Sequence, residues 1–154
     1  MSEIIELTAR LNEILLNGKW VTGTNIKKEI SDLDWKKATQ NINSLNSIAQ
    51  LTFHIDYYIA GVLQVFEGGK LEIKDKYSFD LKPIKSQKDW ENLVEIFCSD
   101  SEKFIQTVQN LTETDLEKIF ADEKYGTFRR NINVIIEHSY YHLGQIMLIK
   151  KLMK

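Results

Sequence analysis

Histidine is the residue type whose spacing in this chain best suits a chemical role. His138 and His142 are four residues apart in the stretch "EHSYYHLGQI", and the third histidine, His54, lies in "LTFHIDYYIAG". Residues four apart on a helix project from the same side about one turn apart, so the two imidazoles can reach one ion. The pair lacks the glutamate of a His-Glu-x-x-His motif, so the sequence does not indicate a metalloprotease of that class.

Each histidine falls inside an apolar segment, and two interpretations stay open. A lone histidine in such a place is more often a core residue held by one hydrogen bond than a metal ligand. Three buried imidazoles without partners would leave ring nitrogens unsatisfied, at a cost of about 1–3 kcal/mol each. One divalent cation would satisfy three of them together. We therefore predict a shared metal site of His54, His138 and His142, with plain core histidines in an interaction protein as the alternative.

Four amphipathic helices are expected to position these residues, because apolar side chains recur at intervals of three and four. The helices are expected from after Ser2 to Asn17-Gly18, from about Ala38 to Phe66, from Ser86 through Val108, and from Thr127 through Leu152. The hydroxyls of Ser2, Ser86 and Thr127 suit N-caps. Four such helices bury their apolar stripes most simply as a four-helix bundle, so the predicted fold class is all-α.

Three connections join these helices. We expect 18–36 to be a packed connection containing a short helix. The connections around 67–86 and 110–127 are longer than an up-down bundle needs, so at least one is expected to cross over the bundle or cover its end. The side chains that select the substrate are expected in these two longer connections.

Composition narrows the class of protein. A chain of 154 residues is expected to form one domain, 1–154. Its 22 acidic and 20 basic residues nearly cancel, which argues against nucleic acid as the main partner. The single cysteine, Cys98, forms no internal disulfide, so a reducing cytoplasm is expected. No run approaches the roughly 20 apolar residues that cross a bilayer, so no membrane partner is expected.

The motifs around the histidines resemble those of the DinB-like superfamily, also called the DinB/YfiT metalloenzyme-like group. In that family one histidine from the second helix and a His-x-x-x-His pair on the last helix bind a divalent metal, and Gly-Gln commonly follows the pair. His54, His138, His142 and Gly144-Gln145 match these positions. The resemblance runs from the first helix to the last. It implies a DinB-like four-helix bundle with long connections, frequent homodimers, and thiol-dependent transferase or isomerase or metal-dependent hydrolase activities.

Three neutral imidazoles without a carboxylate would leave a bound ion with an open position for water or substrate. Such a site can activate water or a thiol, so we predict a metal-dependent transferase or hydrolase acting on a small molecule. We expect zinc or nickel, although imidazoles also suit iron and copper. The alternative is a non-catalytic, dimeric helical bundle that binds a metal or ligand, or a stress-related protein.

Residues near the predicted ligands are candidates for supporting roles. Tyr58, Tyr141 and Gln145 lie at helical spacing from the histidines, so they could contact substrate or orient a ligand. Asp56 is expected at the surface, and Gly144 is expected to permit close helix packing. No carboxylate lies at helical spacing on the ligand face, so we assign no catalytic residue, and a general base would have to come from a connection.

Overall fold

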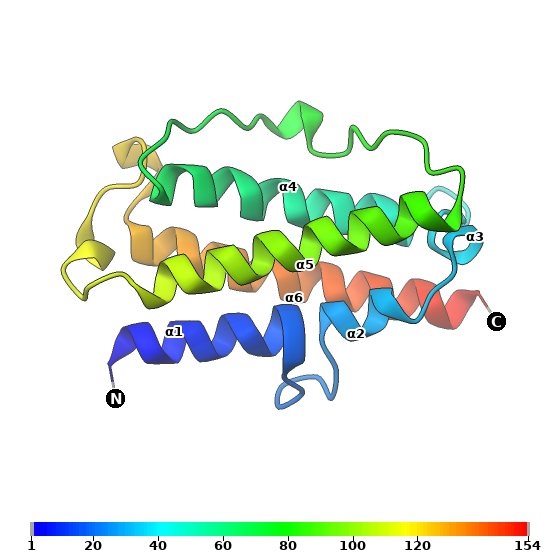
Figure 1. The fold of residues 1–154 in the computed structure, drawn as a ribbon, viewed down its shortest axis with the longest axis horizontal. Coiled ribbons are helices and arrows are strands. Elements are labelled where there is room, and N and C mark those ends of the chain that lie inside the picture. Colours follow the sequence, from blue (N-terminus) through cyan, green and yellow to red (C-terminus); the bar gives the residue numbers. More distant parts are fainter. Residues whose placement is uncertain (1, 154) are drawn as a thin grey trace.

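The computed structural model describes residues 2–153, which form a bundle of helices joined by irregular connections (Figure 1). The long helices are α1 (Glu3–Asn12), continued by a π-helical turn (Glu13–Asn17), α4 (Ile48–Phe66), α5 (Gln87–Gln109) and α6 (Phe128–Leu152). Short helices α2 (Ile26–Ser31) and α3 (Trp35–Ala38) lie in the first connection, and 3₁₀ turns at Asp75–Tyr77, Asp115–Glu117 and Glu123–Tyr125 lie in the other two. Residues 2–153 form no β-strand, only one isolated bridge. The all-α prediction is confirmed.

Side-chain caps fix where the helices begin. The Ser2 hydroxyl accepts a hydrogen bond from the third residue after it, and Ser86 and Thr127 do the same at the starts of α5 and α6. Each cap satisfies a backbone N–H that has no partner within its helix. These three predicted helix starts are therefore confirmed.

The predicted start of the second long helix, at about Ala38, is wrong. Helix α3 ends there, and Asn43 adopts a positive φ of 53° in the turn that follows. A capping box then starts α4: the Ser47 hydroxyl accepts from the Gln50 N–H at 3.1 Å, and the Gln50 side chain accepts from the Ser47 N–H at 2.7 Å. Leu45 continued the apolar spacing of α4, so periodicity alone extended the helix too far.

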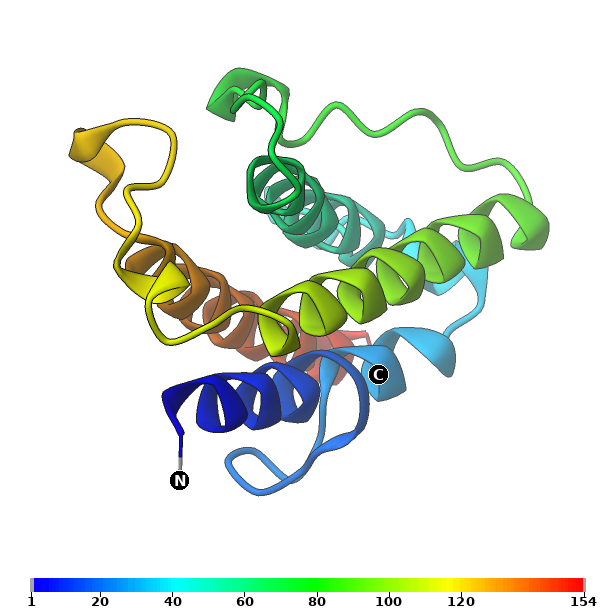
Figure 2. The same cartoon turned by 60° about the vertical axis from the view of Figure 1, so that its left-hand side comes forward.

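Helices α4 and α5 run in the same direction, opposite to α1 and α6 (Figure 1). Two neighbouring parallel helices need a connection that returns along the bundle, and residues 67–86 run back over the length of α4 (Figure 1). Residues 110–127 cover the end of the bundle at which α5 stops and α6 starts (Figure 2). The expected crossover and end cover are both present.

Helix α4 has the most buried residues of the long helices. It packs against both α5 and α6, while α1 packs mainly against α5. Fully buried apolar side chains from all four long helices meet there, among them Leu11, Ile55, Phe97, Phe104 and Ile146. None of the helices in residues 2–153 is both long and apolar enough to span a bilayer.

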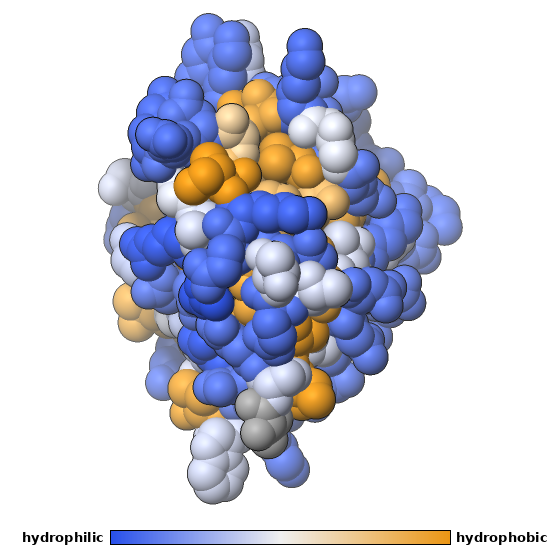
Figure 3. All heavy atoms as spheres, turned by 90° about the vertical axis from the view of Figure 1, so that its left-hand side faces the viewer, coloured by the Kyte–Doolittle hydropathy of each residue, from blue (hydrophilic) through white to orange (hydrophobic). Residues whose placement is uncertain are grey.

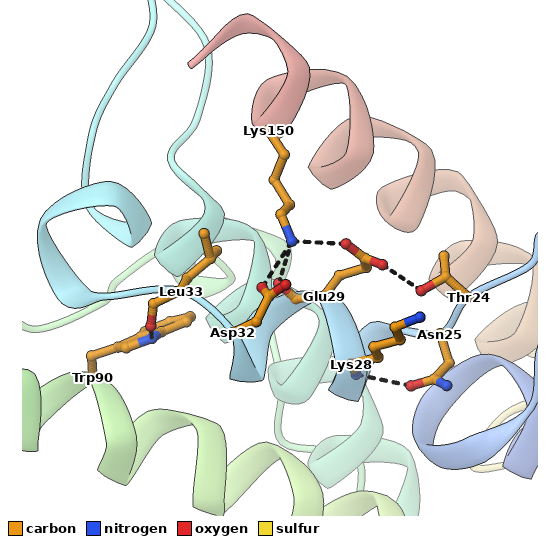
Figure 4. Close-up of polar contacts among 8 residues, drawn as sticks. All are labelled: Thr24, Asn25, Lys28, Glu29, Asp32, Leu33, Trp90 and Lys150. Atoms are coloured by element: carbon orange, nitrogen blue, oxygen red, sulfur yellow. Dashed lines mark hydrogen bonds and ion pairs between the residues drawn. The ribbon is translucent and has the colours of Figure 1, made fainter. Parts of the chain in front are cut away.

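Polar contacts hold the first connection against α5 and α6 (Figure 4). The Lys150 ammonium on α6 donates to Oε1 of Glu29 at 2.8 Å, to its backbone carbonyl at 3.0 Å and to Oδ1 of Asp32 at 2.9 Å. On the other side, the Trp90 indole N–H of α5 donates to the Leu33 carbonyl at 3.1 Å. These contacts fix α2 against the C-terminal half of α6.

Candidate metal centre

The three histidines of the chain meet at one point between α4 and α6. Nε2 of His138 lies 3.1 Å from Nε2 of His54 and 3.0 Å from Nε2 of His142. One nitrogen from each ring lies within 4.8 Å of the others. The structure thus brings together all three residues that the sequence singled out, although they come from helices 84 residues apart in the chain. Their role as metal ligands stays a prediction.

In two of the rings, the hydrogen bond made by the outer nitrogen, Nδ1, determines whether the inner nitrogen, Nε2, presents a lone pair. Nδ1 of His54 lies 3.2 Å from the Ser78 carbonyl, and Nδ1 of His142 lies 2.6 Å from Oε1 of Gln145. Both partners are acceptors, so each Nδ1 carries the proton. In a neutral ring, Nε2 then presents a lone pair, so His54 and His142 both aim lone pairs at Nε2 of His138. A proton on His138 satisfies at most one of them well, whereas a cation satisfies all three.

The surroundings keep the rings neutral, as metal ligands must be. Burial lowers the pKa of each histidine by disfavouring the charged form, and the neighbouring imidazoles lower the pKa of His138 further, to about 4. For His54, the Ser78 carbonyl and the charge of Asp75 oppose the effect of burial. The cluster therefore offers three uncharged nitrogen donors near neutral pH, which suits a divalent cation.

Tyr58 lies beside the histidines and is tied to a carboxylate. Its ring meets the His54 and His138 rings edge-on, with centroids 5.2 and 5.1 Å away, and its hydroxyl donates to Oδ1 of Asp75 at 2.6 Å. Burial and the contact with Asp75 raise the pKa of Tyr58 to about 12, so the phenol keeps its proton at neutral pH. Asp75 belongs to the connection 67–86. The helices supply no carboxylate on the face that carries the histidines, so the one beside them comes from this loop.

Gln145 and Tyr141 differ in their relation to the centre. Gln145 contacts His142 directly through the 2.6 Å hydrogen bond and so orients that ring. Tyr141 contacts the His142 ring edge-on but is 65% exposed and does not line the cavity beside the histidines. Gly144, expected to permit close helix approach, is exposed, and an added Cβ would meet no atom within 4 Å, so no helix within residues 2–153 approaches it closely.

A cavity of about 350 Å³ opens beside the histidines. Most of its wall is apolar, formed by Val62, Leu71, Ile73, Phe120, Val134 and Ile135. Both long connections contribute to this wall, and their role in selecting the substrate stays a prediction. The end of the molecule where α4 and α5 stop shows apolar side chains in a hollow framed by hydrophilic ones (Figure 3).

The connection 67–86 supplies residues that sequence reasoning missed. Besides the Asp75 carboxylate and the Ser78 carbonyl, it places the Phe79 ring parallel to the His54 imidazole, with centroids 4.0 Å apart. These residues follow no helical period, and their contacts with α4 depend on how the crossover folds back. Phe79 is one of several apolar residues in this loop, with Leu71, Ile73 and Leu81 among the others, so it gave no distinct local signal.

Asp56 is buried, 8% exposed, so the expectation of a surface position is wrong. Asp56 lies two residues after His54, so the two side chains point about 200° apart around the helix. The side of α4 that carries Asp56 faces α5 rather than solvent. Burial, followed by the hydrogen bond and charge of Asp100, raises the pKa of Asp56 to about 8. Its Oδ1 has no donor among the described residues, which favours the neutral carboxyl.

Comparison with known proteins agrees with these motifs. The model of the DinB superfamily matches residues 28–146, which is more than half of the chain and includes all three histidines. No curated protein and no solved structure matches the chain. On the strength of the family match, the chain belongs to the DinB superfamily.

Proposed function

We propose that the chain is a metal-dependent enzyme in which His54, His138 and His142 hold one divalent ion, zinc or nickel. A small-molecule substrate reacts there with a thiol or with water. The observation that carries the proposal is the direction of the ring nitrogens: the Ser78 carbonyl and Gln145 take the outer N–H groups, so the inner lone pairs converge.

His54, His138 and His142 would hold the divalent ion, which would supply a Lewis acid that lowers the pKa of a water or thiol at the centre. The protein supplies the proton acceptor. Asp75 lines the cavity with His54 and His138, and Tyr58 fixes its position by donating to Oδ1. We assign Asp75 the role of taking up the proton of the thiol or water, and Tyr58 the role of positioning it.

Screening zinc- and nickel-loaded protein for thiol transfer to small electrophiles and for ester and amide hydrolysis tests this proposal. We expect Asp75→Asn to lower kcat by about 100-fold or more, the usual contribution of a general base, while metal content stays unchanged. Asp80→Asn, an exposed acid on the same connection, is the matched control and should keep full activity. Full turnover in a His54→Ala protein without metal would contradict the proposal. Metal uptake that raises Tm without any turnover would favour the non-catalytic bundle.

We also propose that the chain forms a homodimer through the outer face of α6. Exposed apolar side chains at a spacing of seven residues support this: Tyr141 is 65% and Leu148 57% exposed. Gly144, between them, leaves room for a second backbone. Leu148→Glu should convert a dimer into a monomer in light scattering, and a monomeric wild-type protein would overturn this part of the proposal.

A further inference from the structure

The cavity beside the histidines differs sharply between its two ends. The polar groups His54, Tyr58, Asp75 and His138 share the end at the metal centre. Away from them, the wall is formed by aliphatic and aromatic side chains from α4, α6 and both connections. The composition of this wall therefore limits the charge and polarity of a substrate that the proposed enzyme could bind.

No lysine or arginine lines this cavity within residues 2–153. Apart from a metal ion at the histidines, its one formal charge is the Asp75 carboxylate, so the wall away from the centre offers no cation to a substrate anion. Asn131, the polar residue farthest along α6 from the histidines, uses its amide N–H groups on the carbonyls of Tyr125 and Thr127, each at 2.9 Å. The far end of the wall thus has only neutral polar groups, the Tyr125 hydroxyl and the Asn131 amide, and offers no cation to pair with a carboxylate or phosphate on a substrate. An unpaired buried charge is costly.

The dimensions limit the substrate to a small molecule. About 350 Å³ is at the lower end of the roughly 300–1,000 Å³ that ligand pockets span. Val62 lies eight residues after His54 on α4, and Asn131 seven residues before His138 on α6. At 1.5 Å per residue, the cavity extends about 10–12 Å from the histidines toward Phe120 and Tyr125 at the covered end of the bundle.

We infer that the substrate is an uncharged small molecule with an apolar body, which lies against Val62, Phe120 and Val134 while its one polar reactive group lies at the histidines. This inference rests on the proposed metal-dependent function and specifies the substrate class of that same site. A low-molecular-weight thiol that carries several charges does not fit this wall, so a thiol co-substrate would reach the centre from outside the cavity.

Three hydroxamates that share one metal-binding group test the inference on zinc-loaded protein. They are acetohydroxamate, hexanohydroxamate, and adipic monohydroxamate, in which a carboxylate replaces the terminal methyl of the second. Each buried methylene contributes about four-fold in affinity, so partial burial of four of them should make hexanohydroxamate bind at least about 20-fold more tightly than acetohydroxamate in titration calorimetry. Adipic monohydroxamate should bind no more tightly than acetohydroxamate.

Two matched variants locate the effect. Val134→Glu places a charge in the cavity wall at a position already 38% exposed, and should lower hexanohydroxamate affinity about ten-fold or more without changing acetohydroxamate affinity. Ile96→Glu, at a 51% exposed position on α5, should change neither. Equal affinities for the three probes on metal-loaded protein, or a preference for the carboxylate, would overturn the apolar substrate class and leave the metal centre standing. Failure to take up zinc would overturn the proposed function and this inference with it.

Discussion

Replacing Gln145 with leucine removes the acceptor that orients His142 while keeping a side chain of similar size. The hydrogen bond is short, 2.6 Å, and the His142 ring is buried, so water is poorly placed to substitute for the lost oxygen. Loss of such an outer partner typically costs 10–100-fold in metal affinity. Because this bond is short and shielded, we expect about 30-fold, or about 2 kcal/mol.

Competition against a chromophoric chelator at pH 7.5 measures this change in zinc affinity. Gln145→Glu keeps an acceptor facing Nδ1 and should bind zinc at least as tightly as the wild type. Gln106→Leu, an exposed glutamine on α5, controls for the substitution itself. Unchanged zinc affinity in Gln145→Leu, or a Gln145→Glu protein as weak as the leucine variant, would refute the assignment of Gln145 as the residue that orients His142.

Three further changes probe the stability of the bundle in metal-free protein. The native Asp56 carboxyl, with a pKa of about 8 against 3.8, holds a proton that the unfolded chain has released, so the free energy of unfolding should fall as pH rises from about 4 to 8. Asp56→Asn should flatten that slope in urea titrations, and an unchanged slope would contradict the assignment. Lys150→Met leaves the buried Glu29 carboxylate unpaired and should lower the free energy of unfolding by about 3 kcal/mol, with recovery on adding Glu29→Gln. Gly61→Ala places a Cβ inside van der Waals contact with Ile73, so it should lower the free energy of unfolding by about 1–3 kcal/mol. Ile73→Ala in the same chain should remove the clash and relieve this destabilisation. If the effect of Gly61→Ala persists beside Ile73→Ala, the contact is not its cause.

Local sequence rules were enough to predict most of the fold. Ser2, Ser86 and Thr127 cap helices because a hydroxyl and the N–H three residues later are all that a cap needs. The start of α4 was missed although it has a local signal of its own. Ser47 followed by Gln50 is a capping box, but the apolar period already running through Leu45 obscured it.

The candidate site was predictable only in part, because helical spacing describes its histidines but not the path of the connection that packs against them. The meeting of His54 with His138 and His142 follows from placing helices with buried histidines in one bundle. The contacts of Asp75 and Ser78 with α4 span 17 and 24 residues, and they depend on the path of a crossover that no helical period describes. The burial of Asp56 was missed because α4 is covered on two sides, whereas a single apolar stripe predicts only one buried face.

Metal content of untagged protein, measured by elemental mass spectrometry beside His138→Ala, tests the central claim most directly. His138 is the ring whose Nε2 lies within 3.1 Å of both others, so its loss should break the set of ligands while leaving helical content intact. We predict one divalent ion per chain in the wild type and none in the variant. Wild-type protein without metal after incubation with zinc and nickel, or a variant that retains the ion, would contradict the claim that these histidines form a metal centre.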